Sequence, residues 1–218
     1  MRLPFRIVRH AIGRWHAIRG LIESTPSRPC IHRAGRLRVR ALIGGLALAG
    51  TLSACSPEFN WRELRSPDQG FIVQLPGRPA TMTRSIDLNG VKVDMTMVGA
   101  RVDQALFTVG SVELETADAS LRERSLAAMR IAMLRNIGAE PVPGAPARVG
   151  LVDIAGASRG AIDAITVSAS GQVAGAPVLL QALFAARGNR LWQAVAIVSP
   201  AQELQARTML DSFQVLVP

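Results

Sequence analysis

A cluster of arginines followed by a short apolar run and a cysteine is the feature that most constrains the fold of this chain. The apolar run covers residues 41–51, and the small residues Ser53 and Ala54 lead from it to Cys55. Four arginines precede the run: Arg33, Arg36, Arg38 and Arg40. A positive segment, an apolar segment and small residues in this order are typical of an export signal that a peptidase removes, here at the bond between Ala54 and Cys55.

The apolar run is too short to remain as a membrane span. Residues 41–54 offer 14 positions at most, whereas about 20 apolar residues are needed to cross the hydrocarbon core. The arginines on its N-terminal side match the rule that keeps basic residues in the cytoplasm and sends the downstream part of the chain across the membrane. We therefore expect a signal peptide with a long basic leader at residues 1–54, a lipidated tether at 55–60 and a single domain at 61–218.

The tetrapeptide Leu52-Ser53-Ala54-Cys55 resembles the lipobox of bacterial lipoproteins. This resemblance implies that diacylglycerol alkylates the thiol of Cys55 before cleavage, so the mature chain begins at a lipidated cysteine and has the lipid bilayer as a partner. Asp directly after the cysteine commonly keeps such proteins at the inner membrane. Ser56 stands there instead, which resembles sorting to the outer membrane, so we expect a lipid-anchored protein facing the periplasm.

Removal of the signal changes the charge of the chain. The whole sequence has 25 basic and 16 acidic residues, a formal net charge of +9 and a pI near 11.4. Residues 1–54 hold ten arginines and one acid, Glu23, and 10 minus 1 accounts for the whole excess. A strongly basic chain would indicate nucleic acid or an anionic surface as partner. The mature domain is neutral, so we expect no nucleic acid.

Removal of the signal also removes all three histidines and one of the two cysteines of the chain. The mature part has no tyrosine and a single lysine, Lys92, and its only cysteine is Cys55. The residues lost are His10, His16, His32 and Cys30. Ser/His/Asp and Cys/His catalysis, His-bound zinc and structural disulfides are thereby excluded from the mature chain. We expect a protein that is not an enzyme and carries no cofactor.

Turn dipeptides and apolar patterns predict four strands in the first half of the domain. Residues 70–75 alternate before a Pro-Gly turn. Asn89-Gly90 joins residues 82–88 to 91–98 as a two-residue hairpin, because both central positions of that turn need positive φ. A fourth strand at 104–114 is indicated by its apolar and β-branched content.

The apolar spacing changes to a helical period at residues 119–137. Ser120 and Glu123 fit a capping box at the start of this helix, and Gly138 fits its C-terminal end. A loop rich in proline and glycine is expected next, at residues 140–148.

Strands dominate again after this loop, at residues 151–154, 157–168, 177–187 and 190–198, with Gly188-Asn189 joining the last two as a hairpin. Ser199, Pro200 and Gln202 have the types and spacing of a second helix start. That helix is expected to reach residue 210 or 212. The order of elements predicts an α+β fold in which helices cover a mostly antiparallel sheet.

The opening GFIVQLPGRP at residues 70–79 and the closing MLDSF at residues 209–213 resemble the two ends of PsbP-like domains, a group that includes small bacterial lipoproteins. The resemblance covers nearly the whole mature chain and implies an α/β/α sandwich around an antiparallel sheet. Such domains generally act as binding or assembly modules on larger complexes. The same role is implied here, with an envelope protein partner that the sequence does not identify.

Two methionines are candidate metal ligands. Met95 and Met97 lie two apart on an expected strand and therefore point to the same face, with Met82 near them across the hairpin. Thioethers select Cu(I), so a copper site is one interpretation. Core packing by adaptable methionine side chains is the other, and we favour it.

Two pairs of acids are further candidates. Glu113 and Glu115 would suit acid and base catalysis if burial separated their pKa values. Their place at a strand end makes a solvated face the simpler interpretation. Asp153 and Asp163 are candidates for calcium, but no acid-rich loop surrounds them.

Both tryptophans of the mature chain combine a large apolar surface with one hydrogen-bond donor. Trp192 is expected in the core. Trp61, close to the lipidated end, is expected either at the bilayer interface or at one edge of the domain.

We therefore expect a membrane-anchored, non-enzymatic binding or assembly module of the cell envelope. Two alternatives stay open: a carrier of a small apolar ligand or lipid, and a small enzyme that uses carboxylates or a metal. A carrier would copurify with its ligand, an enzyme would have a polar cleft with perturbed carboxylates, and a module would expose an apolar patch.

Overall fold

The computed structural model describes residues 58–88 and 90–218. The described residues belong to one compact unit. The predicted cleavage site, the lipidation of Cys55 and the start of the tether lie outside the described residues. Within the described part of the chain, neither helix is long and apolar enough to span a membrane.

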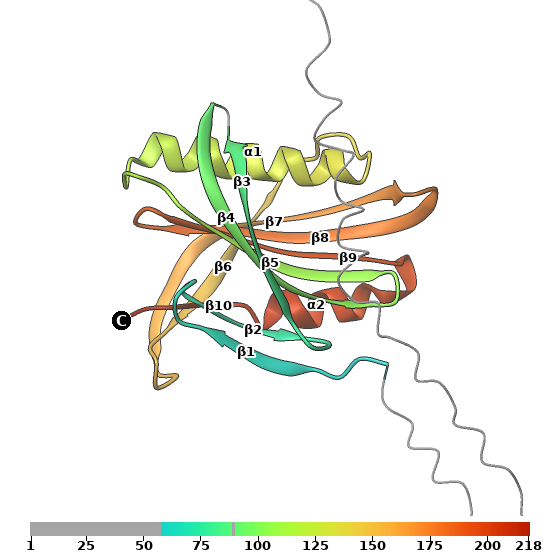
Figure 1. Cartoon of the computed structure of the whole chain (residues 1–218), viewed down its shortest axis with the longest axis horizontal. Coiled ribbons are helices and arrows are strands. Elements are labelled where there is room, and N and C mark those ends of the chain that lie inside the picture. Colours follow the sequence, from blue (N-terminus) through green and yellow to red (C-terminus); the bar gives the residue numbers. More distant parts are fainter. Residues whose placement is uncertain (1–57, 89) are drawn as a thin grey trace, which may run out of the picture. The chain divides into compact units, whose positions relative to one another are not determined.

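The described residues form a single sheet of ten strands, which Figure 1 shows. In chain order the strands are β1 (Arg62–Ser66), β2 (Phe71–Leu75), β3 (Ala80–Leu88), β4 (Val91–Val102), β5 (Ala105–Glu113), β6 (Ala145–Val152), β7 (Ser158–Val173), β8 (Ala176–Arg187), β9 (Arg190–Val198) and β10 (Gln214–Leu216). In space the order is β1-β2-β10-β6-β7-β8-β9-β5-β4-β3. Neighbouring strands are antiparallel except for β10 and β6, which run parallel.

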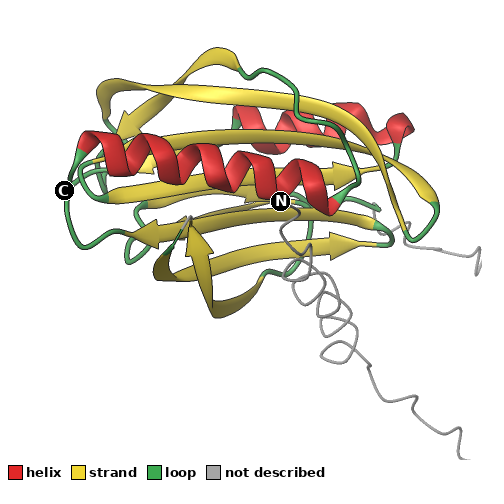
Figure 2. Ribbon diagram, turned by 90° about the horizontal axis from the view of Figure 1, so that it is seen from above, coloured by secondary structure: helices red, strands yellow, loops and turns green. Residues whose placement is uncertain are grey.

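Two helices accompany the sheet, α1 (Ala119–Asn136) and α2 (Glu203–Asp211), and a 3-10 turn, η2 (Pro200–Gln202), leads into α2. The helices pack against opposite faces of the sheet. Figure 2 shows α1 lying over the strands, with α2 beyond them. The sheet curls so that α2 contacts β8 and β9 on one side and β2 on the other (Figure 1).

The predicted α+β sandwich, with a sheet covered by helices, is wrong. Strands make up 55% of the described residues and helices 19%, and the architecture is a curled, mixed, β-rich half-barrel. A helix about 10 Å wide covers about two strands spaced about 4.8 Å apart, so two helices leave most of the ten strands uncovered. The α/β/α sandwich implied by the PsbP-like resemblance is wrong for the same reason.

Backbone pairing makes the sheet larger than the apolar pattern indicates. The short strands β1 and β10 join it, although neither has a clear alternating pattern in the sequence. Strand β7 continues to Val173 rather than ending at Ser168, because β8 pairs with it as far as Ala176. The expected loop at residues 140–148 is partly strand, since β6 begins at Ala145 and pairs with β7.

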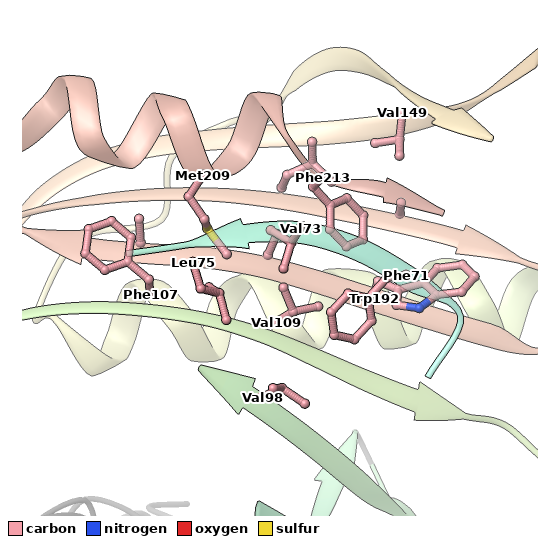
Figure 3. Close-up of a cluster of buried hydrophobic side chains, with 14 of the residues drawn as sticks. Phe71, Val73, Leu75, Val98, Phe107, Val109, Val149, Trp192, Met209 and Phe213 are labelled. Carbon is pink, nitrogen blue, oxygen red and sulfur yellow. The ribbon is translucent and has the colours of Figure 1, made fainter. Parts of the chain in front are cut away.

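The apolar side chains form one core on each face of the sheet. Successive side chains of a strand point to opposite faces, so β9 supplies Trp192 to one core and Leu191 to the other. The α2 core includes Phe71, Val73, Leu75, Phe107, Trp192, Met209 and Phe213. Figure 3 shows Met209 directed from α2 toward Val73 and Leu75. The α1 core includes Val93, Met95, Met129, Leu134, Ile137, Val167, Phe184 and Leu191.

The two predicted hairpins are confirmed. Leu88 pairs with Val91 on either side of the first turn, where Gly90 has a φ of +90°; Asn89 itself lies outside the described residues. Arg187 pairs with Arg190 across the second turn, which contains Gly188 with a φ of +60°. Both turns are determined locally, because the required backbone angles suit glycine and asparagine.

Both helices begin close to where they are predicted, with α1 starting at Ala119. Of the two predicted capping boxes, one is confirmed and one is wrong. The capping box of Ser199 and Gln202 is present. The box expected at Ser120 and Glu123 is wrong, because Asp118 caps α1 instead and accepts a hydrogen bond of 2.6 Å from the amide of Leu121. The hydroxyl of Ser120 donates to Asp118 at 2.8 Å and so supports the cap rather than forming it.

Candidate functional site

A cleft of about 590 Å³ lies between α2 and strands β6, β7 and β8. Its lining includes Ala145, Ala147, Thr166, Leu183, Arg207 and Phe213. The two alanines lie on the strand β6 face that looks toward α2, and their small side chains leave room beside the helix. The apolar pattern misses this cleft because residues 140–148 are expected to be a loop; the alternation of Ala145, Ala147 and Val149 with polar or turn residues is the signal that points to a strand there.

The helix side of the cleft is held by a small polar network. The guanidinium of Arg207 lies 3.2 Å from Oε1 of Glu203, one turn earlier on α2. The same oxygen accepts a hydrogen bond of 3.4 Å from the amide of Gln181, which is a buried cleft residue on β8. Glu203 therefore links the helix to the cleft floor and orients Arg207 beside the opening.

Arg148 on β6 also belongs to the lining, but its side chain points away from the cleft. Its neighbours Ala147 and Val149 pack in the α2 core, and successive side chains of a strand point to opposite faces. The charged side chains of the lining on the α2 side are Arg207 and Asp211. The cleft thus combines an apolar floor with one guanidinium and one carboxylate at its rim.

The structure places the predicted methionines as expected on one face of β4. Met97 pairs directly with Met82 across the hairpin, and Met95 is 4% exposed within the α1 core. The sulfur of Met95 accepts a hydrogen bond of 3.6 Å from the amide of Gln193. The shared face and the proximity of Met82 are confirmed, while the copper site stays a prediction.

A buried glutamine beside Met95 is a feature that the sequence did not predict. Gln193 on β9 is 3% exposed, and its Oε1 has no hydrogen-bond partner. Gly110 on β5 makes room for it, because a Cβ there would lie 3.1 Å from Cγ of Gln193 and 3.1 Å from the sulfur of Met95. A single glutamine within an apolar strand does not indicate from the sequence that its amide is buried.

Glu113, the first acid of the predicted pair, contacts two side chains of the neighbouring hairpin. Glu113 accepts hydrogen bonds from Arg190 at 3.0 Å and from Asn189 at 3.2 Å. The bond from Arg190, followed by that from Asn189, lowers the pKa of Glu113. A general acid at neutral pH needs a raised pKa, which is the opposite of the shift at Glu113. Glu115 is exposed and lies two residues beyond the end of β5.

Asp153 and Asp163 each face an arginine. Asp153 accepts from the amide of Ala157 at 2.8 Å and from Arg159 at 2.7 Å, and these contacts lower its pKa. Asp163 faces Arg148. Among the described residues, no group of three or more His, Cys, Asp or Glu side chains is placed to hold a metal ion.

The two tryptophans occupy different environments. Trp192 is 3% exposed and donates a hydrogen bond of 2.8 Å to the carbonyl of Gln69, so its predicted core position is confirmed. Trp61 is half-buried and packs against the edge of Phe107, with the ring centroids 5.9 Å apart. Phe59 stacks on Trp61 at 6.3 Å. These rings attach the start of the domain to the α2 core.

No known protein family matches this chain, and no curated protein matches it in sequence. The functional inference therefore rests on the residues and geometry of the chain itself.

Proposed function

We propose that this protein is an exported lipoprotein, tethered to the outer membrane through Cys55, and that its domain is a non-enzymatic binding module. The cleft between α2 and strands β6 to β8 is the observation that carries this proposal. Its volume of about 590 Å³ falls within the range of roughly 300–1,000 Å³ that is usual for small-molecule sites.

The lining of the cleft favours a small amphiphilic ligand. Ala145, Ala147 and Leu183 offer apolar surface to a short hydrocarbon portion. Arg207, oriented by Glu203, offers a guanidinium at the opening, and a guanidinium binds carboxylate or phosphate with charge-assisted hydrogen bonds. A ligand with an apolar body and one anionic group would satisfy both parts of the lining.

Binding without catalysis is supported by the chemistry of the mature chain. The carboxyl groups with shifted pKa values are those of Glu113, Asp118 and Asp153, and all three are lowered. None of them lines the cleft. The cleft of the mature protein also receives no histidine or tyrosine, because the sequence after Cys55 contains neither.

The proposed anchor explains how such a module would work in the envelope. A diacylglyceryl thioether and an N-acyl group at Cys55 give three chains, beyond the two signals needed for stable attachment. The domain would then meet its ligand at the membrane surface, where amphiphilic molecules concentrate.

Filling the cleft tests the proposal. Ala145 is exposed on β6 and faces the cleft, so Ala145→Trp should obstruct it without changing either core. Ala161 is exposed on β7 and lies outside the lining, so Ala161→Trp is the matched control. Native mass spectrometry of the protein purified from membranes, with dodecanoate and dodecyl phosphate as probes, would measure one-to-one binding. Wild type and control should bind, and Ala145→Trp should not.

Equal binding by both tryptophan variants would exclude the cleft as the site. A wild-type protein that binds neither probe and copurifies with no small molecule would leave the ligand-binding proposal without support.

A second candidate, an assembly module, is favoured by the edge of the sheet. Strand β3 is a nine-residue strand at the edge of the sheet, and among the described strands it pairs with β4 alone. Its outer backbone groups could therefore pair with a strand of another protein. Crosslinking in cells followed by purification distinguishes the candidates. A partner crosslinked repeatedly through residues of β3 would favour assembly.

A further inference from the structure

We propose that one particular end of the domain lies against the lipid surface that holds Cys55. This end, here called the entry end, consists of residues 58–61, the β4–β5 turn at 102–105, the tip of the β7–β8 hairpin at 172–177 and the β9–α2 connection at 199–204. The proposal rests on the lipid anchor proposed above and goes beyond it, because it assigns an orientation and a contact surface to the domain.

The length of the chain limits how far the entry end can be from the membrane. Phe59 is fixed to the domain by its contacts with Trp61 and Phe107, at ring centroid distances of 6.3 Å each. The amide of Asn60 also donates to the carbonyl of Pro76 at 3.2 Å. Three residues lie between Cys55 and Phe59, so four steps along the chain join them, and a fully extended chain spans at most about 3.6 Å per step. The lipidated residue can therefore lie no more than about 14 Å from Phe59.

The strand register places the other segments of the entry end, which are turns between strands, at the same end of the sheet. Leu106 pairs with Ile197, which places the β4–β5 turn beside the end of β9. Leu179 pairs with Val198, so the β7–β8 hairpin continues beyond that point to its tip. In Figure 1 these turns and the start of β1 all lie on the right-hand side.

Exposed apolar side chains are concentrated at the entry end. Three large hydrophobic residues of the described chain are well exposed: Leu204 at 72%, Val173 at 43% and Ile154 at 72%. Leu204 lies in the first turn of α2, and Val173 lies at the tip of the β7–β8 hairpin, so both belong to the entry end. Single exposed apolar residues are normal on a protein surface. Two of these three, however, lie at the end of the domain that the short tether to Cys55 keeps near the bilayer.

The hairpin tip has the composition of an interfacial segment. Residues 169–186 contain no charged side chain, and charge is what makes insertion into the membrane interface costly. Elsewhere the entry end contains three exposed acids, Glu58, Asp103 and Glu203, and no basic residue. Glu203 is paired with Arg207, and the exposed Arg101 lies next to the β4–β5 turn. The contact proposed with the bilayer is therefore apolar and does not depend on a positive charge.

The chain itself supplies a matched pair of positions for the test. Leu204 and Ile154 are equally exposed at 72%. Ile154 lies in the β6–β7 turn, at the opposite end of β7 from Val173; that strand has 16 residues and at about 3.3 Å per residue extends roughly 50 Å. The mature chain has no cysteine other than Cys55, so Leu204→Cys and Ile154→Cys each introduce a single thiol for labelling.

Each variant would be purified in its full lipidated form from bacterial membranes, labelled with an environment-sensitive fluorophore and reconstituted. The vesicles would contain phosphatidylethanolamine and phosphatidylglycerol with brominated acyl chains. We expect the label at position 204 to shift to the blue and to be quenched at least twofold more than the label at position 154. Val173→Cys should behave like Leu204→Cys.

Two results would overturn the orientation. Equal, weak quenching at all three positions in protein that floats with the vesicles would show that the anchor holds but the entry end does not touch lipid. A blue shift at position 204 without quenching by brominated lipid would indicate a second copy of the chain as the occupant. Failure to float with the vesicles would contradict the anchor itself, and flotation therefore separates the two proposals.

Discussion

Gly171 of β7 lies directly against Ile137, the residue that ends α1. A methyl group at Gly171 would come within 2.8 Å of Cδ1 and 2.9 Å of Cβ of Ile137. The neighbouring amide, that of Gln172, donates a hydrogen bond of 2.7 Å to the carbonyl of Ile137. The end of the helix is thus fixed to the long hairpin by close backbone contact, which only glycine permits.

We expect Gly171→Ala to lower the free energy of unfolding by about 1–3 kcal/mol, the usual cost of overpacking a well-packed site. Gly150→Ala is the control, because a Cβ at Gly150 would meet its nearest atom, on Gln214, at an ordinary 3.7 Å. Urea denaturation would measure both variants. An equal effect of the two substitutions would contradict the proposed contact.

The cap of α1 gives a second prediction. Asp118→Ala should lower the melting temperature more than Ser120→Ala, because Asp118 accepts from a backbone amide at the start of α1, that of Leu121. Ser120 makes only exposed side-chain hydrogen bonds, to Asp118 and from Arg124. Asp118→Asn keeps the acceptor and should retain most of the stability. Circular dichroism melting curves would rank the three variants. A larger drop in melting temperature for Ser120→Ala than for Asp118→Ala would support the capping box predicted from the sequence.

The pH dependence of stability gives a third prediction, through Asp153. The amide of Ala157, and then Arg159, lower its pKa from the ordinary 3.8. A lowered pKa means that the ionised carboxylate stabilises the fold above about pH 4, and that this contribution is lost as the pH falls through the folded-state pKa. Asp153→Asn should therefore be less stable than wild type at pH 7, and the difference should shrink by pH 3.

Urea midpoints at the two pH values would test this. Asp163→Asn is the control, because its side chain is 93% exposed and lies 3.5 Å from Arg148, and exposed ion pairs contribute little. A difference between Asp153→Asn and wild type that stays constant down to pH 3 would exclude the linkage.

The buried Gln193 gives a fourth prediction. Its Oε1 has no partner, so Gln193→Met should leave stability unchanged or raise it by up to about 1–2 kcal/mol, since an unsatisfied buried acceptor is removed. Gln181→Met on neighbouring β8 is the contrast, because the amide of Gln181 donates to Glu203; that variant should lose about 0.5–1.5 kcal/mol. A clear loss of stability in Gln193→Met would contradict this prediction and indicate that the amide of Gln193 makes a stabilising interaction.

The anchor gives a fifth prediction. Cys55→Ser removes the thiol that lipidation requires, so the protein should leave the membrane fraction and its signal should remain uncleaved. Fractionation with immunoblotting would follow both the location and the length of the chain. Ser56→Ala is the control, because it keeps the thiol. Membrane retention with normal cleavage in Cys55→Ser would contradict the lipoprotein proposal.

Local chemistry in the sequence determined the local structure of this protein. The hairpin at Gly188, the capping box of Ser199 and Gln202, and helix α1 were all predicted, because each depends on residues within a few positions of one another. The same holds for the shared face of Met95 and Met97, which results from the two-residue period of a strand.

Only the tertiary structure decided the fold class and the cleft. Strand β10 lies between β2 and β6 because of backbone hydrogen bonds among segments distant in the chain, such as the pairing of Val215 with both Phe71 and Leu151. Backbone groups are the same in every residue, so side-chain patterns do not encode such pairings. The curl that these pairings produce brings α2 between β8–β9 and β2, and it places Arg207 of α2 and Ala145 of β6 in the lining of one cleft.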